Sequence, residues 1–297
     1  MSNTMAGLRR KISSAGDLQS VVRTMKALAA SSIGQYEKSV RTLTDYHRTV
    51  ELGLGACLRE AETGGTLRMA VKEQRDAGTI GAIVFGSDQG LVGQFNDVVT
   101  EAVVRTLAAL PGKPQVWAVG ERVHARLMDA KLPVVGLFSL PNSVQAIAPL
   151  VGQIQIKSEE RRARGDQEEV YVFHNRPQSG SVYRPVSQRL LPLDAQWQVG
   201  LARISWPTRN PPEIMGVGAG TLLALVREYL FISLFRACAE SLASENAARL
   251  AAMERADRNI DDLLEELRGT FNRLRQTSID EELFDVIAGC ETLTNGA

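Results

Sequence analysis

Proline is missing from both ends of this 297-residue chain, since all eleven prolines lie between Pro111 and Pro212. Proline removes a helix hydrogen bond and clashes with the preceding turn, so its absence permits long uninterrupted helices at either end. We therefore expect a long helix at each terminus and a compact domain between them. Such an arrangement favours a mechanical or scaffolding role over an enzymatic one.

Cysteines, histidines and long apolar runs are also scarce. Cys57, Cys238 and Cys290 are odd in number and widely spaced, which argues against a disulfide framework and a zinc site. The three histidines are scattered, without metal-ligand spacing. No stretch approaches the ~18 apolar residues of a membrane span, and the N-terminus lacks the apolar core of a signal peptide. We expect a soluble, cytoplasmic chain that reaches a membrane only through partners.

Charge is distributed unevenly along a chain whose formal net charge is zero. Residues 1–50 carry eight Lys and Arg against three Asp and Glu, whereas residues 213–297 carry eight Arg against fifteen Asp and Glu. Two terminal helices of opposite sign would attract each other when antiparallel. The alternative is two unrelated solvated faces.

The two ends show the apolar spacing of amphipathic helices. From Met5 to about Leu58, apolar residues recur every three or four positions, close to heptad spacing. Asn210 before Pro211 and Pro212 is a typical helix start, and a helical pattern then runs to Leu293. A helix of that length needs a partner along it. We therefore expect an antiparallel coiled coil, beyond which the longer C-terminal helix projects.

The middle of the chain alternates between strand and helix patterns. Thr79–Phe85 is a short, apolar, β-branched run typical of a buried parallel strand. Alternation with short loops predicts a Rossmann-like open α/β sheet. Further strands are predicted at 115–119, 134–138, 170–174 and 189–193, with helices at 97–110, 121–130 and 142–164. The expected fold class is thus α/β, with an N-terminal coiled-coil helix (1–60), a central α/β domain (75–205) and a C-terminal coiled-coil helix (211–297).

Four blocks of the sequence are distinctive: SSAGDLQSVVRTMKALAASSI (13–33), GSDQGLVGQFN (86–96), LASENAARLAAMERADRN (242–259) and FNRLRQTSIDEELFDVIAGCETL (271–293). In this order along the chain, they resemble blocks of the gamma subunit of rotary F-type ATP synthases. The two C-terminal blocks are highly specific, while the central loop alone is weak. Departures from the family pattern indicate a divergent branch; they are Gln89, Val92, Gln94, Asp280 and Cys290, which replace the usual Arg, Cys, Gly, Thr and Ala.

The resemblance implies a central rotor stalk with no catalytic residue, cofactor or metal of its own. The terminal helices would form an antiparallel coiled coil inside the ring of alternating alpha and beta subunits. The central domain would lie at the foot, against the epsilon subunit and the membrane c-ring. Ion flow through the c-ring would turn the shaft and drive ATP synthesis, or hydrolysis in reverse. The implied location is the cytoplasmic face of the bacterial inner membrane, as a peripheral subunit.

Particular residues take roles by position in this resemblance. Met25 and Lys26 fall near the lever loop of a beta subunit, and Arg275 and Gln276 fall where the shaft contacts the beta catch loop. Arginine suits such a contact because it pairs bidentately with carboxylates. The alternative for each residue is an exposed helix position without a partner. The tip of the shaft, sleeved by apolar surfaces of the hexamer, would contain Ile279, Phe284, Val286, Ile287 and Leu293.

Two other classes of function compete with the rotor. A nucleotide-dependent enzyme could use Gly86, Gly90 and Gly93 to cradle phosphate at a helix N-terminus. However, GSDQGLVG fits neither the GxGxxG nor the P-loop pattern, and the alternative is a tight turn that packs against the coiled coil. A free-standing coiled-coil adaptor would be stable alone, without affinity for an alpha–beta hexamer. Nucleic-acid binding is not expected, because the cluster of Arg161, Arg162 and Arg164 lacks interleaved aromatics.

Overall fold

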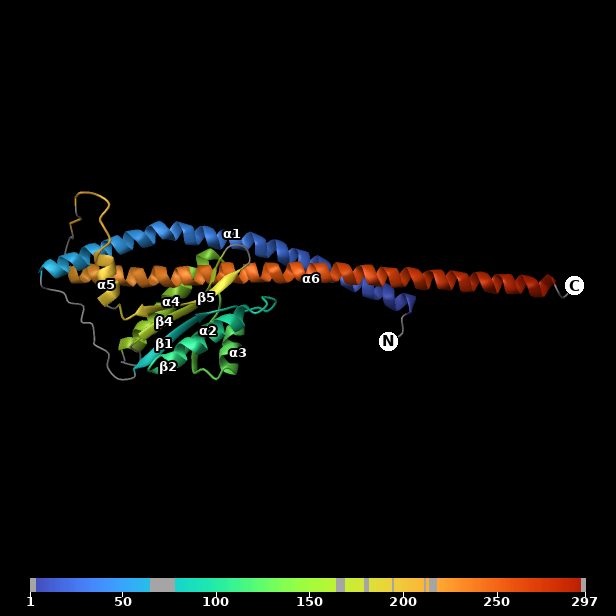
Figure 1. The fold of residues 1–297 in the computed structure, drawn as a ribbon, viewed down its shortest axis with the longest axis horizontal. Coiled ribbons are helices and arrows are strands. Elements are labelled where there is room, and N and C mark those ends of the chain that lie inside the picture. The colour runs from blue at the N-terminus through green and yellow to red at the C-terminus, as the bar shows by residue number, and fades with distance from the viewer. Residues whose placement is uncertain are drawn as a thin grey trace. The chain divides into compact units, whose positions relative to one another are not determined.

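The computed structural model describes residues 4–64, 78–163, 169–178, 182–193, 195–210, 212–213 and 218–294, without the side chains of 61–64, 163, 195–196, 218–219 and 288–294 (Figure 1). The chain divides into two compact units. We call Met1–Leu28 with Leu250–Ala297 the coil unit, and Ala29–Arg249 the sheet unit. Helices α1 (Met5–Gly64) and α6 (Gly218–Thr294) contribute to both units, and all the strands belong to the sheet unit.

A five-stranded sheet with the order β3-β2-β1-β4-β5 forms the centre of the sheet unit. Strand β1 (Thr79–Phe85) pairs in parallel with β2 (Lys113–Val119) and β4 (Glu169–Pro177), and β2 pairs in parallel with β3 (Val134–Phe138). Strand β5 (Tyr183–Leu191) runs antiparallel to β4. The order reverses beside β1, as in doubly wound folds. The predicted open α/β sheet is therefore confirmed.

Helices cover both faces of this sheet (Figure 1). Successive side chains of β1 point to opposite faces, so the strand contributes to two apolar cores. On one face, α2 (Phe95–Ala109) and α3 (Glu121–Asp129) pack on Ala82 and Val84 of β1. On the other face, Ile83 and Phe85 share a core with α4 (Ile147–Ala163), α1 and the first part of α6. The sheet is thus held between helices, and α6 is part of its core.

Helices α1 and α6 run antiparallel within the sheet unit. The Tyr46 hydroxyl donates a hydrogen bond of 2.9 Å to Glu228, and further along α1 a Cβ on Gly53 would lie 3.3 Å from the Leu225 side chain. Residue numbers therefore rise along α1 while those of the facing residues fall along α6, as in an antiparallel pair. No helix in the described part of the chain combines the length and apolarity needed to cross a membrane.

Several boundaries predicted from the sequence differ from those observed, and three of them are instructive. Helix α6 begins at Gly218, and residues 212–213, where the helix was predicted to start, are not helical. The prediction failed because a Pro-Pro pair fits an extended segment as well as a first helical turn. Helix α4 begins at Ile147, after a 3₁₀ turn at Val144–Ala146, which places Pro149 in its first turn. Strand β5 begins at Tyr183. The three-part domain division stays a prediction.

A short helix, α5 (Ala195–Ala202), was not expected from the sequence. It packs against α1 and α6: the Trp197 indole N–H donates to the Tyr229 hydroxyl at 3.1 Å, and Arg59 Nη1 donates to the carbonyls of Ala202 and Ile204 at 2.9 Å. These tertiary contacts offset the weak intrinsic stability of an eight-residue helix.

Candidate coupling surface

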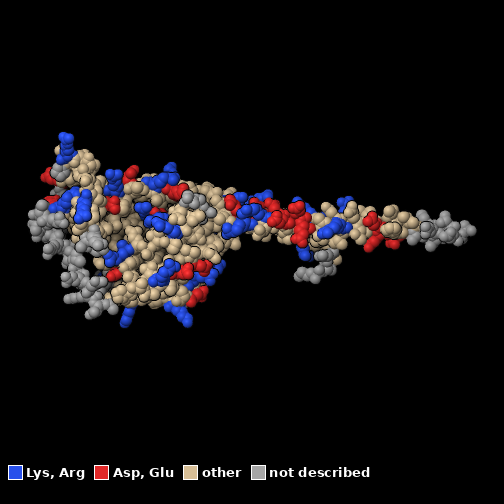
Figure 2. Space-filling view, in the orientation of Figure 1, with Lys and Arg blue, Asp and Glu red and all other residues tan. Residues whose placement is uncertain are grey.

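In the coil unit, charged and polar side chains around Asp257 join α1 to α6. The Asp257 carboxylate accepts hydrogen bonds from Arg23 Nε at 3.2 Å and Gln19 Nε2 at 3.3 Å, and it lies 3.8 Å from Lys26 Nζ. One turn further along α6, Asp261 lies 3.7 Å from Arg23. Basic and acidic side chains accordingly adjoin along this stretch of the coil (Figure 2). The expected attraction between oppositely charged terminal helices is confirmed here.

An apolar seam lies between the same two segments. Its buried residues repeat at heptad spacing, with Ala15 and Val22 on α1 and Met253 and Ile260 on α6. Met25 is partly buried against this seam. Surface ion pairs contribute little stability, so the seam holds the helices together while the charged cluster fixes their register.

The four predicted contact residues lie in two separate places. Met25 packs on the seam, and Lys26, with 39% of its side chain exposed, is paired with Asp257. Arg275 and Gln276 are exposed on α6. Because Arg275 is 18 residues beyond Asp257, about 27 Å of helix separates the two places. The structure therefore places the four predicted contact residues in two regions of the coil unit and does not combine them into one site.

Beyond these residues, α6 carries an exposed stretch that mixes apolar and acidic side chains. The Arg9 guanidinium lies 5.4 Å from the Phe271 ring centroid, close to the start of α1. Further along, the predicted tip residues are largely exposed: Ile279 51%, Phe284 68%, Val286 64% and Ile287 46%. The exposed acids Asp280, Glu281, Glu282 and Asp285 lie among them. The side chain of Leu293 lies outside the described residues.

A second exposed apolar row on α1 was missed in the sequence. Leu18, Val21 and Leu28 are exposed by 55%, 55% and 64%, although they lie beside the buried seam residues. They follow intervals of three and seven residues, which places them on one side of the helix. That spacing could have revealed the row, but the sequence analysis assigned the apolar residues of this helix to a single face. This part of α1 therefore has one apolar face toward α6 and another toward solvent.

Hydrogen bonds between its own residues hold the glycine-bearing loop 86–96 in shape. The Ser87 N–H donates to Asn96 Oδ1 at 3.0 Å, and Asn96 Nδ2 donates back to Ser87 Oγ at 2.8 Å. The Asp88 carboxylate accepts from the N–H groups of Glu121 and Leu140 at 2.9 and 3.1 Å, so a carboxylate already occupies the start of α3. Val92 and Phe95 pack on Ala248 of α6. The loop is thus a tight turn that packs against α6, and a carboxylate of its own takes the donor at the start of α3.

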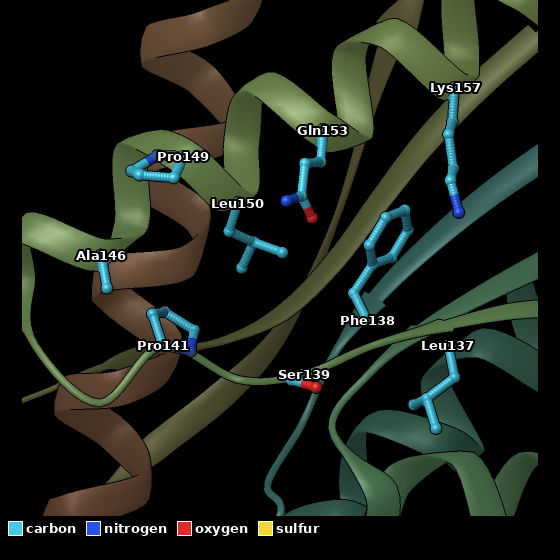
Figure 3. A pocket seen from close by; sticks show the side chains of 9 residues that line it. All are labelled: Leu137, Phe138, Ser139, Pro141, Ala146, Pro149, Leu150, Gln153 and Lys157. Atoms are coloured by element: carbon cyan, nitrogen blue, oxygen red, sulfur yellow. The ribbon is translucent and has the colours of Figure 1, made fainter.

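A pocket of about 460 Å³ lies elsewhere, between the end of β3 and α4 (Figure 3). Lys157 is its one charged lining residue, and the ammonium nitrogen lies 5.0 Å from the centroid of the Phe138 ring. No residue of the loop 86–96 lines it. The pocket therefore gives no support to nucleotide binding by the glycine-bearing loop.

Known proteins are similar to this chain over almost its whole length. The ATP synthase gamma chain of Herpetosiphon aurantiacus is 24% identical over 295 residues, covering 96% of this chain and 97% of the relative. That of Syntrophus aciditrophicus is 27% identical over 308 residues, covering 97% and 98%. The model of a family described as ATP synthase matches residues 4–293. The chain belongs to the ATP synthase gamma-chain family.

As a gamma-family chain, it is a non-catalytic subunit of the ATP synthase central stalk, and catalysis belongs to the beta subunits. A solved structure agrees on the fold: a chain in the rotor of the Euglena gracilis mitochondrial ATP synthase has a TM-score of 0.60 at 17% identity, covering 93% of this chain and 98% of that one. The identities of 24% and 27% fit the divergent branch that the departures in sequence indicate.

Proposed function

We propose that this gamma-family chain couples ion flow through a membrane c-ring to ATP synthesis or hydrolysis at an alpha–beta hexamer, by rotating inside the hexamer. The exposed apolar residues of α6 carry this proposal. Ile279, Phe284 and Val286 are each more than half exposed on a helix stretch beyond the described contacts with α1. Exposed apolar surface of this kind marks an interaction site, and a sleeve of apolar surface on the hexamer would cover it.

The proposed mechanism is mechanical and needs no reactive group on this chain. Each beta subunit would meet a different side of the turning coil, so rotation would bias its conformational states in sequence. Lys26 is held by Asp257 and would present a fixed charge to one region of the beta subunits. Arg275 and Gln276 would contact another region. The apolar row of Leu18, Val21 and Leu28 adds a third surface for the hexamer to cover.

The sheet unit would bind the epsilon subunit and the c-ring. The chain would then be a peripheral subunit on the cytoplasmic face of the bacterial inner membrane. In a rotor subunit, the loop 86–96 would have a structural role and would not bind phosphate. It packs the sheet against α6 through the contact of Phe95 with Ala248.

Reconstitution with the alpha and beta subunits of the same organism tests the proposal. We expect one copy of the chain per hexamer and ATP hydrolysis that depends on it. The double variant Arg275→Ala, Gln276→Ala should assemble but turn over more slowly, by about fivefold or more if the charged contact is made in the rate-limiting state. Arg268→Ala, another exposed arginine of α6, is the matched control and should leave turnover unchanged. Failure of the wild-type chain to associate with the hexamer would refute the rotor.

A further inference from the structure

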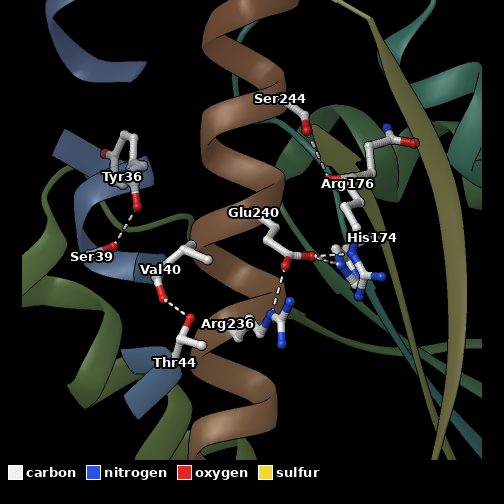
Figure 4. A network of polar contacts seen from close by, with 10 residues as sticks. Tyr36, Ser39, Val40, Thr44, His174, Arg176, Arg236, Glu240 and Ser244 are labelled. Atoms are coloured by element: carbon white, nitrogen blue, oxygen red, sulfur yellow. Dashed lines mark hydrogen bonds and ion pairs between the residues drawn. The ribbon is translucent and has the colours of Figure 1, made fainter. Parts of the chain in front are cut away.

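Two arginines and a histidine surround one buried glutamate in the sheet unit (Figure 4). The Glu240 side chain on α6 is 4% exposed and accepts three hydrogen bonds: from His174 Nε2 at 2.8 Å, Arg176 Nε at 2.7 Å and Arg236 Nε at 2.8 Å. Arg184 on β5 lies directly opposite Arg176 on β4. Opposed residues of paired strands share one face, so Arg184 adds a third guanidinium beside this network.

The glutamate fixes the two guanidinium groups in position. Arg176 and Arg236 are 32% and 41% exposed, and both bind Glu240 through Nε. A guanidinium that donates through Nε keeps four N–H donors on its two Nη atoms. Arginines anchored in this way lose less side-chain entropy on binding a further anion than free surface arginines do. The arrangement is therefore organised before any ligand arrives.

Positive charge is in excess at this place. Burial lowers the pKa of His174, against the opposing effect of Glu240, so the imidazole is neutral at pH 7. One carboxylate then faces Arg176 and Arg236, and Arg184 adds a further positive charge on the neighbouring strand. Like charges directly opposite each other on paired strands are unfavourable, and in the described part of the chain no carboxylate forms an ion pair with Arg184. An added anion would relieve this imbalance.

We propose that Arg176, Arg184 and Arg236 form a docking site for an acidic segment of a protein partner. Free phosphate is bound characteristically by backbone N–H groups at helix starts and nests. Here Arg236 lies inside α6 and the other two lie in paired strands, so none of the three is at a helix start. Side-chain forks on a partly exposed surface suit the carboxylates of aspartate and glutamate, which arginine binds bidentately.

Binding of a synthetic ten-residue glutamate peptide to the full chain tests this site, with a ten-residue glutamine peptide as the uncharged match. Isothermal titration should show binding of the glutamate peptide that weakens with salt. Arg184→Gln and Arg236→Gln should each reduce the affinity by about fivefold or more. Arg227→Gln is the matched control, because Arg227 is a 59% exposed arginine of the same helix that pairs with Glu159. It should bind as the wild type does.

Three results would overturn the inference. The first is no binding of the glutamate peptide to a wild-type chain that is folded by circular dichroism. The second is an equal loss of affinity in Arg227→Gln, which would mean that the peptide is attracted to positive charge in general and not to a specific site. The third is displacement of the peptide by inorganic phosphate at a comparable affinity and matched ionic strength, which would make this a small-anion site. Arg184→Gln keeps the test sound, because Arg184 makes no described bond to Glu240 and its loss should leave the fold intact.

Discussion

At Glu240, three donors overcome the cost of burying a carboxylate. Burial alone would raise the pKa of Glu240, but hydrogen bonds from His174, Arg176 and Arg236 outweigh burial and lower the pKa from 4.5 to about 2. A carboxyl whose folded pKa is depressed adds stability that is present above the unfolded pKa and lost as the pH falls through the folded one. Glu240 should therefore stabilise the sheet unit at neutral pH and cease to do so between pH 4.5 and 2.

We expect Glu240→Gln to lower the free energy of unfolding at pH 7 by on the order of 2–3 kcal/mol. The difference from the wild type should shrink as the pH falls from 4.5 to 2. Urea denaturation followed by circular dichroism at a series of pH values measures both effects. A difference that stays constant over this range would mean that the charge of Glu240 contributes nothing and that only its packing matters.

At the scale of elements, helix α5 docks where α1 offers a glycine. A Cβ on Gly55 would lie 2.5 Å from the carbonyl oxygen of Leu201, which is backbone and cannot move aside cheaply. Gly55→Ala should therefore displace α5 and cost about 1–3 kcal/mol in thermal or urea unfolding. Gly34→Ala is the control within the same helix, because nothing lies within 4 Å of its Cβ position. It should stabilise by about 0.5–1 kcal/mol, and equal effects of the two changes would contradict the close α1–α5 contact.

The same elements show what could be predicted from the sequence. The bounds of β1 and β3 were predicted as observed, because short apolar runs flanked by turns are local signals. Helix α5 could not be predicted, because its stability depends on contacts with residues far away in the sequence. Trp197 of α5 binds Tyr229, and Arg59 binds the carbonyl of Ala202. Strand β5 was partly missed because its first residues include Arg184 and Pro185, which suit an edge strand and carry little strand signal.

The candidate sites divide in the same way. Opposite charge on the two terminal helices predicted their attraction, but the convergence of Gln19, Arg23 and Lys26 on Asp257 required the register of the coil. The network at Glu240 joins β4 to α6 over 64 residues of sequence, and no local pattern marks it. The roles of Arg275 and Gln276 rest on resemblance and position, and they stay predictions.

For the whole molecule, the two units differ in what stabilises them. The sheet unit has two extensive apolar cores that include β1 on both faces. In the coil unit most of the described buried residues belong to one small seam, and the ion pairs beside it are partly exposed. Local opening free energy follows burial and contact density, so the coil unit of the free chain should open far more readily than the sheet.

Hydrogen exchange on the free and the assembled chain tests this difference together with the rotor. In the free chain, amides of residues 5–28 and 250–287 should exchange faster than those of β1 and α2. On assembly with an alpha–beta hexamer, the coil unit should slow by about tenfold or more, because covering the exposed apolar residues adds at least about 1.4 kcal/mol to its opening free energy. Amides of β1 should change little, since their core is complete in the free chain. Slowing confined to the sheet unit, with residues 275–287 unaffected, would mean that the hexamer binds the sheet unit. That result would exclude the coil unit as the part that rotates inside the hexamer.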